Sequence, residues 1–369
     1  MNENVKASAV SDILGHAQND SRIDENEALR LLNVRGSDFH RVLAVADTVR
    51  QMRVGDEVSY IINRNINFTN ICIGSCGFCA FSVREDDPEA YFLSVDKVVK
   101  RAIEARQIGA TEIGLFSGLH PAVDGNTYVE ILQAVKEAVP DIHIHALSPA
   151  EVAYGADKLG ISYVNMLKML KRAGLDSMPG TAAEILVDDV RKTLCPQKID
   201  TQTWTDIIVS AHRLGIPTTC TMMYGHIESY EDVVNHLKLL RTIQDETGGF
   251  TEFVPLTFIH YNTPIFKAGI ARPGATGRED LLIYAVGRLY LDNIPNIQVS
   301  WVKLGTKLAQ IALMCGANDL GGTLMEENIT RSAGGTAGQS LTPNDFIRLI
   351  TDLGRIPRVR DTLYRTQSC

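Results

Sequence analysis

The sequence lacks several features that direct proteins to nucleic acid, to membranes or to an export pathway. It contains no dense run of Lys and Arg, and its formal net charge is −8, so we expect no bulk binding to nucleic acid or to an anionic membrane. No apolar run reaches the roughly 18 residues that a transmembrane helix needs. The N-terminal stretch is polar and has no apolar h-region, so no signal peptide is expected.

Disulfide scaffolds, linkers and dinucleotide motifs are also missing. The seven cysteines are an odd number, and four of them stand singly, at Cys195, Cys220, Cys315 and Cys369. This usage favours a reducing cytoplasm, with buried and unreactive thiols at the three internal positions. No Pro/Ser-rich linker interrupts the 369 residues, which favours one domain, and no G-x-G-x-x-G motif follows the first predicted strand.

What the sequence does contain is a long alternation of strand and helix patterns. Residues 1–55 carry helical patterns at 24–34 and 37–55, and we assign them to an N-terminal helical extension. About eight strand-then-helix units follow within residues 56–369. Such alternation predicts an α/β fold with a parallel sheet and outer helices. A closed (β/α)8 barrel of the TIM type fits best, and a doubly wound open sheet is the alternative.

The expected elements of the barrel can be placed from their patterns. Strands are predicted at 57–65, 111–116, 141–147, 174–178 (weakly), 217–223, 251–259, 297–302 and 318–324. Helices are predicted at 95–110 with Ser94 as the cap, at 128–139, after the capping box at 148–151, and at 204–216, 230–246, 279–293, 305–317 and 343–355.

Three cysteines lie together directly after the first predicted barrel strand, in "NICIGSCGFCAF". We call Cys72, Cys76 and Cys79 the loop cysteines. The loops after barrel strands form the active face, so the loop cysteines are predicted to lie there. Iron–sulfur clusters and structural zinc usually take four ligands, so three thiolates on a [4Fe–4S] cluster would leave one iron open to a substrate or cosubstrate. The alternative is a structural or zinc-binding role with a distant fourth ligand.

The C-x3-C-x2-C loop resembles that of the radical S-adenosylmethionine (SAM) superfamily. In that superfamily the amino and carboxylate groups of SAM chelate the open iron, so the resemblance implies that the missing ligand is the cosubstrate. It also implies reductive cleavage of SAM to methionine and a 5′-deoxyadenosyl radical that abstracts a hydrogen atom. Phe78, just before the third cysteine, matches the aromatic residue that usually lies near the adenine.

Further motifs are similar to the CofH family, the tyrosine-using component of FO synthase, from about residue 55 onward. "NINFTNIC" and "MMYGHIE" are shared with the CofG, MqnE and MqnC families, whereas "SMPGTAAEIL" and "NDLGGTLMEE" point more narrowly to CofH. The resemblance implies transfer of the hydroxybenzyl fragment of L-tyrosine to 5-amino-6-(D-ribitylamino)uracil, with release of 2-iminoacetate. The product leads to FO, the deazaflavin core of coenzyme F-420.

The same resemblance implies functional partners, and two alternative functions must be weighed against it. CofG would be the functional partner, and a reductant such as ferredoxin or flavodoxin would supply the electron. No second three-cysteine loop occurs, so we expect a separate subunit rather than a fused synthase. The first rival is an MqnE-like aminofutalosine synthase of menaquinone biosynthesis. The second is a non-catalytic electron-transfer protein, which the open site argues against because electron carriers normally saturate their cluster.

The resemblance also implies roles for single residues that bind SAM. Glu184 in "GTAAEIL" matches a SAM-binding carboxylate, and Arg191 in "VRKTLCP" matches the base that faces the methionine carboxylate. The family usually has two glycines before "LHP", where this chain has Ser117 and Gly118. Glycine permits close approach of the backbone, and Ser117 could offer a hydroxyl instead.

The remaining candidates follow other strand ends, and each has a simpler explanation. Tyr224 is a candidate for cofactor contact, and the candidates for substrate contact are His120, His226, Glu228, Asn318 and Asp319. His120 could instead cap a turn, and His226 could be a core histidine. Asn318 and Asp319 are expected to close the eighth strand, where Asn, Asp and Gly would also suit a turn.

Overall fold

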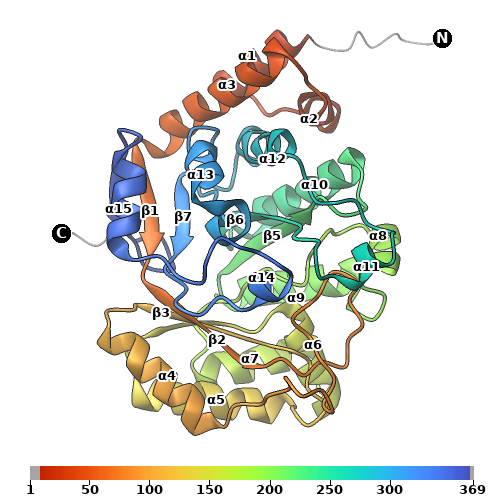
Figure 1. Ribbon diagram of the computed structural model, residues 1–369, viewed down its shortest axis with the longest axis vertical. Coiled ribbons are helices and arrows are strands. Elements are labelled where there is room, and N and C mark those ends of the chain that lie inside the picture. The colour runs from red at the N-terminus through yellow and green to blue at the C-terminus, as the bar shows by residue number, and fades with distance from the viewer. Residues whose placement is uncertain (1–8, 366–369) are drawn as a thin grey trace.

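Parallel strands form the centre of the molecule in a computed structural model that describes residues 9–365 (Figure 1). The predictions for the extreme N-terminus and for Cys369 lie outside the described residues. The strands are β1 (Glu57–Ile61), β2 (Asn63–Thr69), β3 (Glu112–Ser117), β4 (His143–Ala146), β5 (Thr218–Tyr224), β6 (Phe250–Thr257), β7 (Asp319–Gly322) and β8 (Ile356–Val359).

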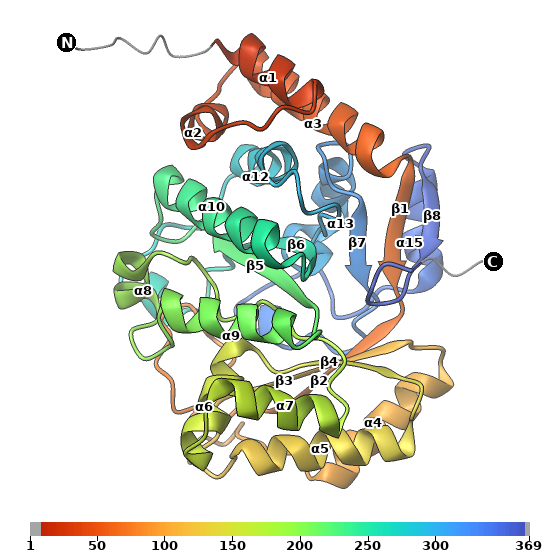
Figure 2. The same cartoon turned by 180° about the vertical axis from the view of Figure 1, so that it is seen from behind.

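Helices cover the outside of the strands, as Figures 1 and 2 show from opposite sides. They are α1 (Val10–Gln18), α2 (Glu25–Leu32), α3 (Ser37–Val54), α4 (Val95–Gln107), α5 (Gly125–Ala138), α6 (Pro149–Leu159), α7 (Tyr163–Ala173), α8 (Asp188–Leu194), α9 (Thr201–Arg213), α10 (Tyr230–Thr247), α11 (Pro264–Lys267), α12 (Gly277–Tyr290), α13 (Trp301–Ala312), α14 (Ile329–Ser332) and α15 (Pro343–Thr351).

The strands close into a barrel with eight strand positions, which confirms the predicted fold class. Strand pairs β2–β3, β3–β4, β5–β6 and β1–β7 are parallel. Single bridges join the gaps: residues 177–178 link β4 to β5, and residues 297–298 link β6 to β7. The backbone N–H of Asn65 donates to the carbonyl oxygen of Leu324, so the chain after β7 also pairs with β2 and completes the ring.

Most predicted elements are confirmed, and two strand predictions need correction. The strand expected at 57–65 divides into β1 and β2, because β1 pairs with β7 and β8 whereas β2 pairs with β3. The strand expected at 297–302 is wrong beyond Gln298, since α13 begins at Trp301. The buried indole of Trp301 donates to the carbonyl of Gly322, so the apolar pattern there reflects a buried anchor.

The capping predictions have different outcomes. The box at 148–151 is confirmed, because the Ser148 side chain accepts from the Glu151 N–H and the Glu151 carboxylate accepts from the Ser148 N–H. Ser94 lies at the N-cap of α4, but its side chain makes no capping hydrogen bond. Helix α7 and strand β8 were not predicted from the sequence.

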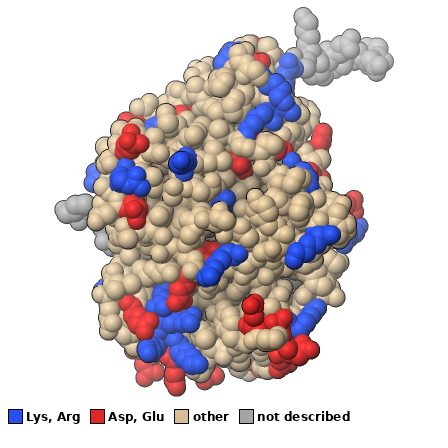
Figure 3. All heavy atoms as spheres, in the orientation of Figure 1, with Lys and Arg blue, Asp and Glu red and all other residues tan. Residues whose placement is uncertain are grey.

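The N-terminal helices lie at one end of the molecule, outside α10 and α12 (Figures 1 and 2). Helix α3 packs on α12, and α2 packs on α10 and α12. The division of the chain at residues 55 and 56 stays a prediction. No helix in the described part of the chain combines the length and apolar character needed to cross a membrane. Acidic and basic side chains lie interspersed on the face shown in Figure 3.

Candidate active site at the three-cysteine loop

The loop cysteines follow β2 and lie at the carboxyl end of the barrel, as predicted. Their loop is fixed on both sides by backbone hydrogen bonds. The N–H of Gly77 donates to the carbonyl of Leu194 at the end of α8 (2.8 Å). The Gly77 carbonyl accepts from the N–H of Ile265 in α11 (2.9 Å). The loop is therefore clamped between the segments that follow the fourth and sixth barrel positions.

The thiols of this loop differ from the other described cysteines. All three are free and half-buried, whereas Cys195, Cys220 and Cys315 are free and buried, as expected. The Cys72 sulfur accepts backbone N–H groups from Gly74 and Leu119, both at 3.3 Å. Such donors stabilise negative charge on sulfur, which is the form that binds metal.

The thiols of the loop suit one of two kinds of metal site. Within residues 9–365, no three His, Cys, Asp or Glu side chains converge on one point as ligands of a single ion would. A [4Fe–4S] cluster bonds its thiolates to different irons, so its ligands need not meet at one point. Three half-buried thiols on one clamped loop fit such a cluster.

Gly118 shows why the end of β3 requires a glycine. A Cβ at this position would lie 2.3 Å from the carbonyl oxygen of Ile71 and 3.0 Å from the Cβ of Cys72. The backbone of β3 therefore touches the start of the cysteine loop directly. The predicted close approach is present at Gly118 without a second glycine before it.

Ser117 directs its hydroxyl into the protein. The hydroxyl and the backbone N–H of Ser117 both donate to Oε1 of Glu151 in α6, at 2.8 and 3.1 Å. Burial raises the pKa of the Glu151 carboxyl, while these hydrogen bonds lower it. Cofactor contact by Ser117 stays a prediction, and its side chain is already engaged in holding α6 against β3.

Glu184 is a buried carboxylate with one unsatisfied oxygen. Oε1 pairs with Nζ of Lys198 at 2.6 Å. Oε2 has no hydrogen-bond partner among the described residues, and the nearest guanidinium nitrogen of Arg191 is 3.6 Å away. The backbone at Glu184 is left-handed, with φ of 41°. A buried unpaired oxygen and a strained backbone are both costly, and such features concentrate at functional sites.

Arg191 is committed to the backbone rather than free to meet a ligand. Its guanidinium donates to carbonyl oxygens of residues 182, 183, 185 and 199, at distances from 2.5 to 3.4 Å. It therefore holds the segment that carries Glu184. The expected contact of Arg191 with a carboxylate of SAM stays a prediction, because nearly all of its donors are already used.

Lys198 is a basic residue of the site that the sequence interpretation missed. Its ammonium lies 5.0 Å from the centre of the Phe78 ring, besides pairing with Glu184. The charge of Lys198 also lowers the pKa of Cys76, although burial raises that pKa to about 12. Lys198 ends the motif "VRKTLCPQK", so the motif contained the signal. Phe78, Glu184 and Lys198 thus meet beside Cys76.

Tyr224 is turned away from this group. Its buried hydroxyl donates to Oδ1 of Asp280 in α12 at 2.7 Å. Burial raises the pKa of both groups, and the short hydrogen bond joins the end of β5 to α12. Contact of Tyr224 with a cofactor stays a prediction, and its side chain has a structural partner.

The predicted pair His226 and Glu228 forms a closed turn after β5. Nε2 of His226 bonds the carbonyl of Met223 at 3.1 Å, and its Nδ1 accepts the N–H of Ile227 at 2.7 Å. Glu228 accepts the N–H of His226 at 2.8 Å and pairs with Arg272 at 2.9 Å. The arrangement matches the simpler interpretation of His226 as a satisfied core histidine.

His120 likewise caps a turn. Its Nδ1 accepts the N–H of Ala122 at 3.0 Å, and its ring stacks on Phe92 at a centroid distance of 4.7 Å. Its carbonyl oxygen accepts the hydroxyl of Tyr154 at 2.9 Å. The simpler explanation offered for His120 is therefore observed, and a substrate contact stays a prediction.

The placement predicted for Asn318 and Asp319 is wrong. They open strand β7 rather than close it, so they lie at the opposite end of the barrel from the loop cysteines. Oδ1 of Asn318 accepts from Arg288 at 2.8 Å, and Asp319 pairs with Arg360 at 2.5 Å. Asn318 thus has a buried hydrogen-bond partner and Asp319 a buried ion-pair partner, and a substrate contact by either residue stays a prediction.

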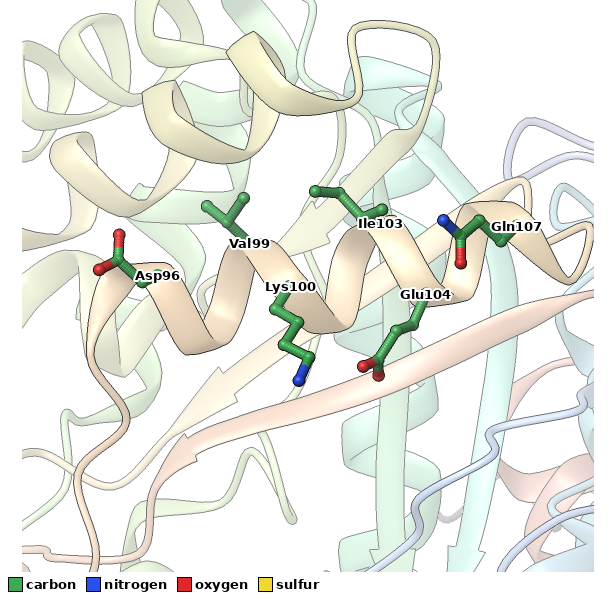
Figure 4. A pocket seen from close by; sticks show the side chains of 6 residues that line it. All are labelled: Asp96, Val99, Lys100, Ile103, Glu104 and Gln107. Carbon is green, nitrogen blue, oxygen red and sulfur yellow. The ribbon is translucent and has the colours of Figure 1, made fainter.

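A surface hollow elsewhere has no convergent chemistry. It has a volume of about 420 Å³ and lies along α4. Figure 4 shows that its six labelled side chains all come from this one helix and do not point toward a common centre. The hollow lacks the inward-facing polar groups that mark binding sites, so the cysteine loop is the candidate site.

Comparisons with known proteins agree with this geometry. Residues 66–240 match the model of the radical SAM superfamily, and residues 247–369 match the CofH/MqnC C-terminal region. Methylornithine synthase (PylB) shares the fold, with a TM-score of 0.74 and 17% identity, covering 94% of this chain and 97% of that one. The hydrogenase maturase HydG has a TM-score of 0.76 and 16% identity, covering 96% and 77%.

The barrel and the three-cysteine loop define a radical SAM enzyme. Among curated relatives, the 5-amino-6-(D-ribitylamino)uracil–L-tyrosine 4-hydroxyphenyl transferase of Methanothermobacter thermautotrophicus is 53% identical, over 94% of this chain and 95% of the relative. The enzyme of that name from Methanocaldococcus jannaschii is also 53% identical, over 94% and 97%. The chain belongs to this family of transferases.

Proposed function

We propose that this chain transfers the hydroxybenzyl fragment of L-tyrosine to 5-amino-6-(D-ribitylamino)uracil and releases 2-iminoacetate. The observation that carries the proposal is the identity of about half of all residues with transferases of that name, over nearly the whole of each chain. The product would be the precursor of FO in coenzyme F-420 synthesis.

The proposal includes a [4Fe–4S] cluster held by the three loop cysteines, with SAM as cosubstrate. Such a cluster with SAM bound supplies a 5′-deoxyadenosyl radical, together with methionine. The chain's own residues hold the loop in place: Gly118 sets the distance from β3, and the Gly77 backbone clamps the loop to α8 and α11.

Glu184 is proposed as the acceptor for a polar group of SAM. Its unsatisfied Oε2 is available for a hydrogen bond, while Lys198 fixes Oε1. Arg191 orients the backbone that presents Glu184. Phe78 offers an aromatic face beside Lys198, which suits an adenine ring. These contributions position the cosubstrate and exclude water, while the hard chemistry belongs to the cofactor.

Two partners and a location complete the proposal. A second radical enzyme of the CofG type would consume the product, and a low-potential protein such as ferredoxin or flavodoxin would reduce the cluster. A cytoplasmic setting is proposed because the described cysteines outside the loop are free and single, as a reducing compartment favours.

An anaerobic product assay tests the function. Reconstituted enzyme, reductant and SAM are combined with tyrosine and the diaminouracil, and in parallel with an enolpyruvyl ether of the menaquinone pathway. Deoxyadenosine and a hydroxybenzyl–uracil adduct are expected only in the first mixture. Deoxyadenosine formed only with the enolpyruvyl ether would instead establish aminofutalosine synthase activity.

A further inference from the structure

Lys303 is a basic side chain on the active face that the mechanism above does not use. It lies in the short turn that begins α13, just after the seventh barrel position at 297–298. The turn is fixed by the buried indole of Trp301, which donates to the Gly322 carbonyl at 3.0 Å, and by the Lys303 N–H, which donates to Ser300.

The backbone separates this turn from the rest of its helix. Gly305 has φ of 73° and ψ of 156°, which breaks the helix directly after the turn. A residue of any other type would be strained in this conformation. Lys303 is therefore held by the barrel mouth itself rather than by the outer layer of helices.

Three adjacent loops bring Lys303 close to the loop cysteines. The segment 297–298 is bridged to β7, and β7 pairs with β1, which leads directly into β2. Each of these three neighbouring positions is followed by one residue of interest: Lys303 follows the segment 297–298, Glu327 follows β7, and Cys79 follows β2. The charges of Glu327 and Cys79 both raise the pKa of Lys303, although burial lowers it overall.

Lys303 differs from Lys198 and Arg272 because its ammonium has no partner among the described residues. Lys198 pairs with Glu184, and Arg272 pairs with Glu228 and Glu279. The carboxylate of Glu327, whose charge acts on Lys303, instead accepts hydrogen bonds from the N–H and hydroxyl of Thr330. Within the described residues, no hydrogen bond or ion pair engages the Lys303 ammonium.

The Lys303 side chain is half-buried and its ammonium has no partner among the described residues, so it is available to bind an anion that enters the barrel mouth. Two carboxylates would enter this mouth, one from SAM and one from the amino-acid substrate. The group formed by Phe78, Glu184 and Lys198 lies beside Cys76, at the fourth barrel position. Lys303 lies at the seventh position, beside Cys79, so it is separate from the group proposed for SAM.

We infer that Lys303 binds the α-carboxylate of the amino-acid substrate and thereby orients it beside the cluster loop. The inference rests on the proposed function and names a positioning residue for it. Binding of the carboxylate at Lys303 would fix the orientation of the substrate's amino group and aromatic side chain relative to the cluster loop. The proposal predicts a preference for amino acids over the corresponding amines.

Substitution combined with a substrate lacking the carboxylate tests this role. The variants are Lys303→Met, which keeps the length without charge, and Lys303→Arg, which keeps the charge. Lys100→Met, on the exposed face of α4 in Figure 4, is the matched control. Each holoenzyme is assayed for deoxyadenosine formation with tyrosine and with tyramine, and the ratio of kcat/KM values is compared within one preparation.

Lys303→Met is expected to raise KM for tyrosine roughly 10- to 100-fold, the value of a charged hydrogen bond, and to leave tyramine unaffected. Lys303→Arg should restore most of the preference, and Lys100→Met should equal the wild type. If the Met variant does not turn over, calorimetric binding of tyrosine to its cluster-loaded, SAM-bound form gives the same comparison.

An unchanged tyrosine-to-tyramine ratio in Lys303→Met would overturn the inference, as would weaker binding of SAM with the ratio preserved. Failure of the wild type to use tyrosine at all would refute the proposed function instead. The two failures are therefore distinguishable in one set of assays.

Discussion

Replacement of Gly118 by Ala should damage both the stability of the protein and its cluster. The added Cβ would lie 2.3 Å from the Ile71 carbonyl oxygen, whereas carbon–oxygen contacts in proteins lie at about 3.3 to 3.6 Å. The overlap of roughly 1 Å is with backbone, so no side-chain rotamer relieves it. Overpacking lowers the free energy of unfolding by about 1 to 3 kcal/mol, and we expect a value near 3 kcal/mol here because the clash is with backbone atoms. The relaxation must displace Ile71 and Cys72.

The assay compares the free energy of unfolding of the apoprotein in guanidinium with the iron and sulfide bound after reconstitution. We expect a loss of about 3 kcal/mol and reduced iron content in Gly118→Ala. Gly15→Ala is the control, because no atom lies within 4 Å of the new Cβ in α1, and it should stabilise by up to about 1 kcal/mol. Normal stability and full iron loading in Gly118→Ala would refute the close-approach reasoning.

Four further outcomes are expected. Changing any loop cysteine to Ala should abolish cluster assembly, whereas Cys195→Ala should retain it, as measured by iron content and visible absorption. Glu184→Gln should weaken SAM binding in calorimetry and leave the cluster intact, since it removes the negative charge of the carboxylate that has one unpartnered oxygen and pairs with Lys198 through the other. Asn318→Ala should lower the free energy of unfolding by about 2 to 3 kcal/mol because it leaves the buried Arg288 donor unpaired, with KM for tyrosine unchanged. Burial raises the pKa of Glu252 from 4.5 to about 7, so the folded state binds a proton more tightly than the unfolded state and loses stability as pH rises from 4.5 through 7. In urea titrations, the free energy of unfolding of Glu252→Gln should therefore gain up to about 3 kcal/mol relative to wild type between these limits. A difference between the two proteins that does not change with pH would contradict this.

The barrel could be predicted because its elements carry periodic signals. Buried strands and amphipathic helices repeat along the chain, and parallel pairing follows from their alternation. Strand β8 escaped prediction because it is short, only partly buried and contains Pro357, and proline normally argues against a strand. Helix α7 was detectable, since Ser162 caps a strongly amphipathic segment.

The cysteine loop was predictable because all three thiols are close in the sequence. Lys198 and Lys303 were not recognised because a lysine in or beside a helix is usually solvated, and only the folded chain shows their neighbours. The error at Asn318 arose from the glycines that follow it. Gly321 and Gly322 resemble a turn after a strand, but they belong to β7, where a Cβ at Gly322 would meet the Asn63 side chain at 2.1 Å.

The family resemblance predicted ligand contacts for several residues whose side chains make internal hydrogen bonds in the structure. Arg191 was expected to face a ligand, but its guanidinium stabilises the segment that presents Glu184. Hydrogen-bond partners of a long side chain depend on loop conformation, which a single sequence does not reveal. Tyr224 and His226 likewise have internal partners that only the folded chain shows: Tyr224 donates to Asp280 of α12, and His226 bonds within its own turn.

Transfer of label from ring-deuterated tyrosine tests the central claim most directly. The wild-type holoenzyme is incubated anaerobically with SAM, reductant, the labelled tyrosine and 5-amino-6-(D-ribitylamino)uracil, and the products are resolved by mass spectrometry. The account predicts that the ring label appears in a uracil adduct, in step with deoxyadenosine and 2-iminoacetate. Deoxyadenosine formation with tyrosine consumed but no ring label in any uracil product would contradict it.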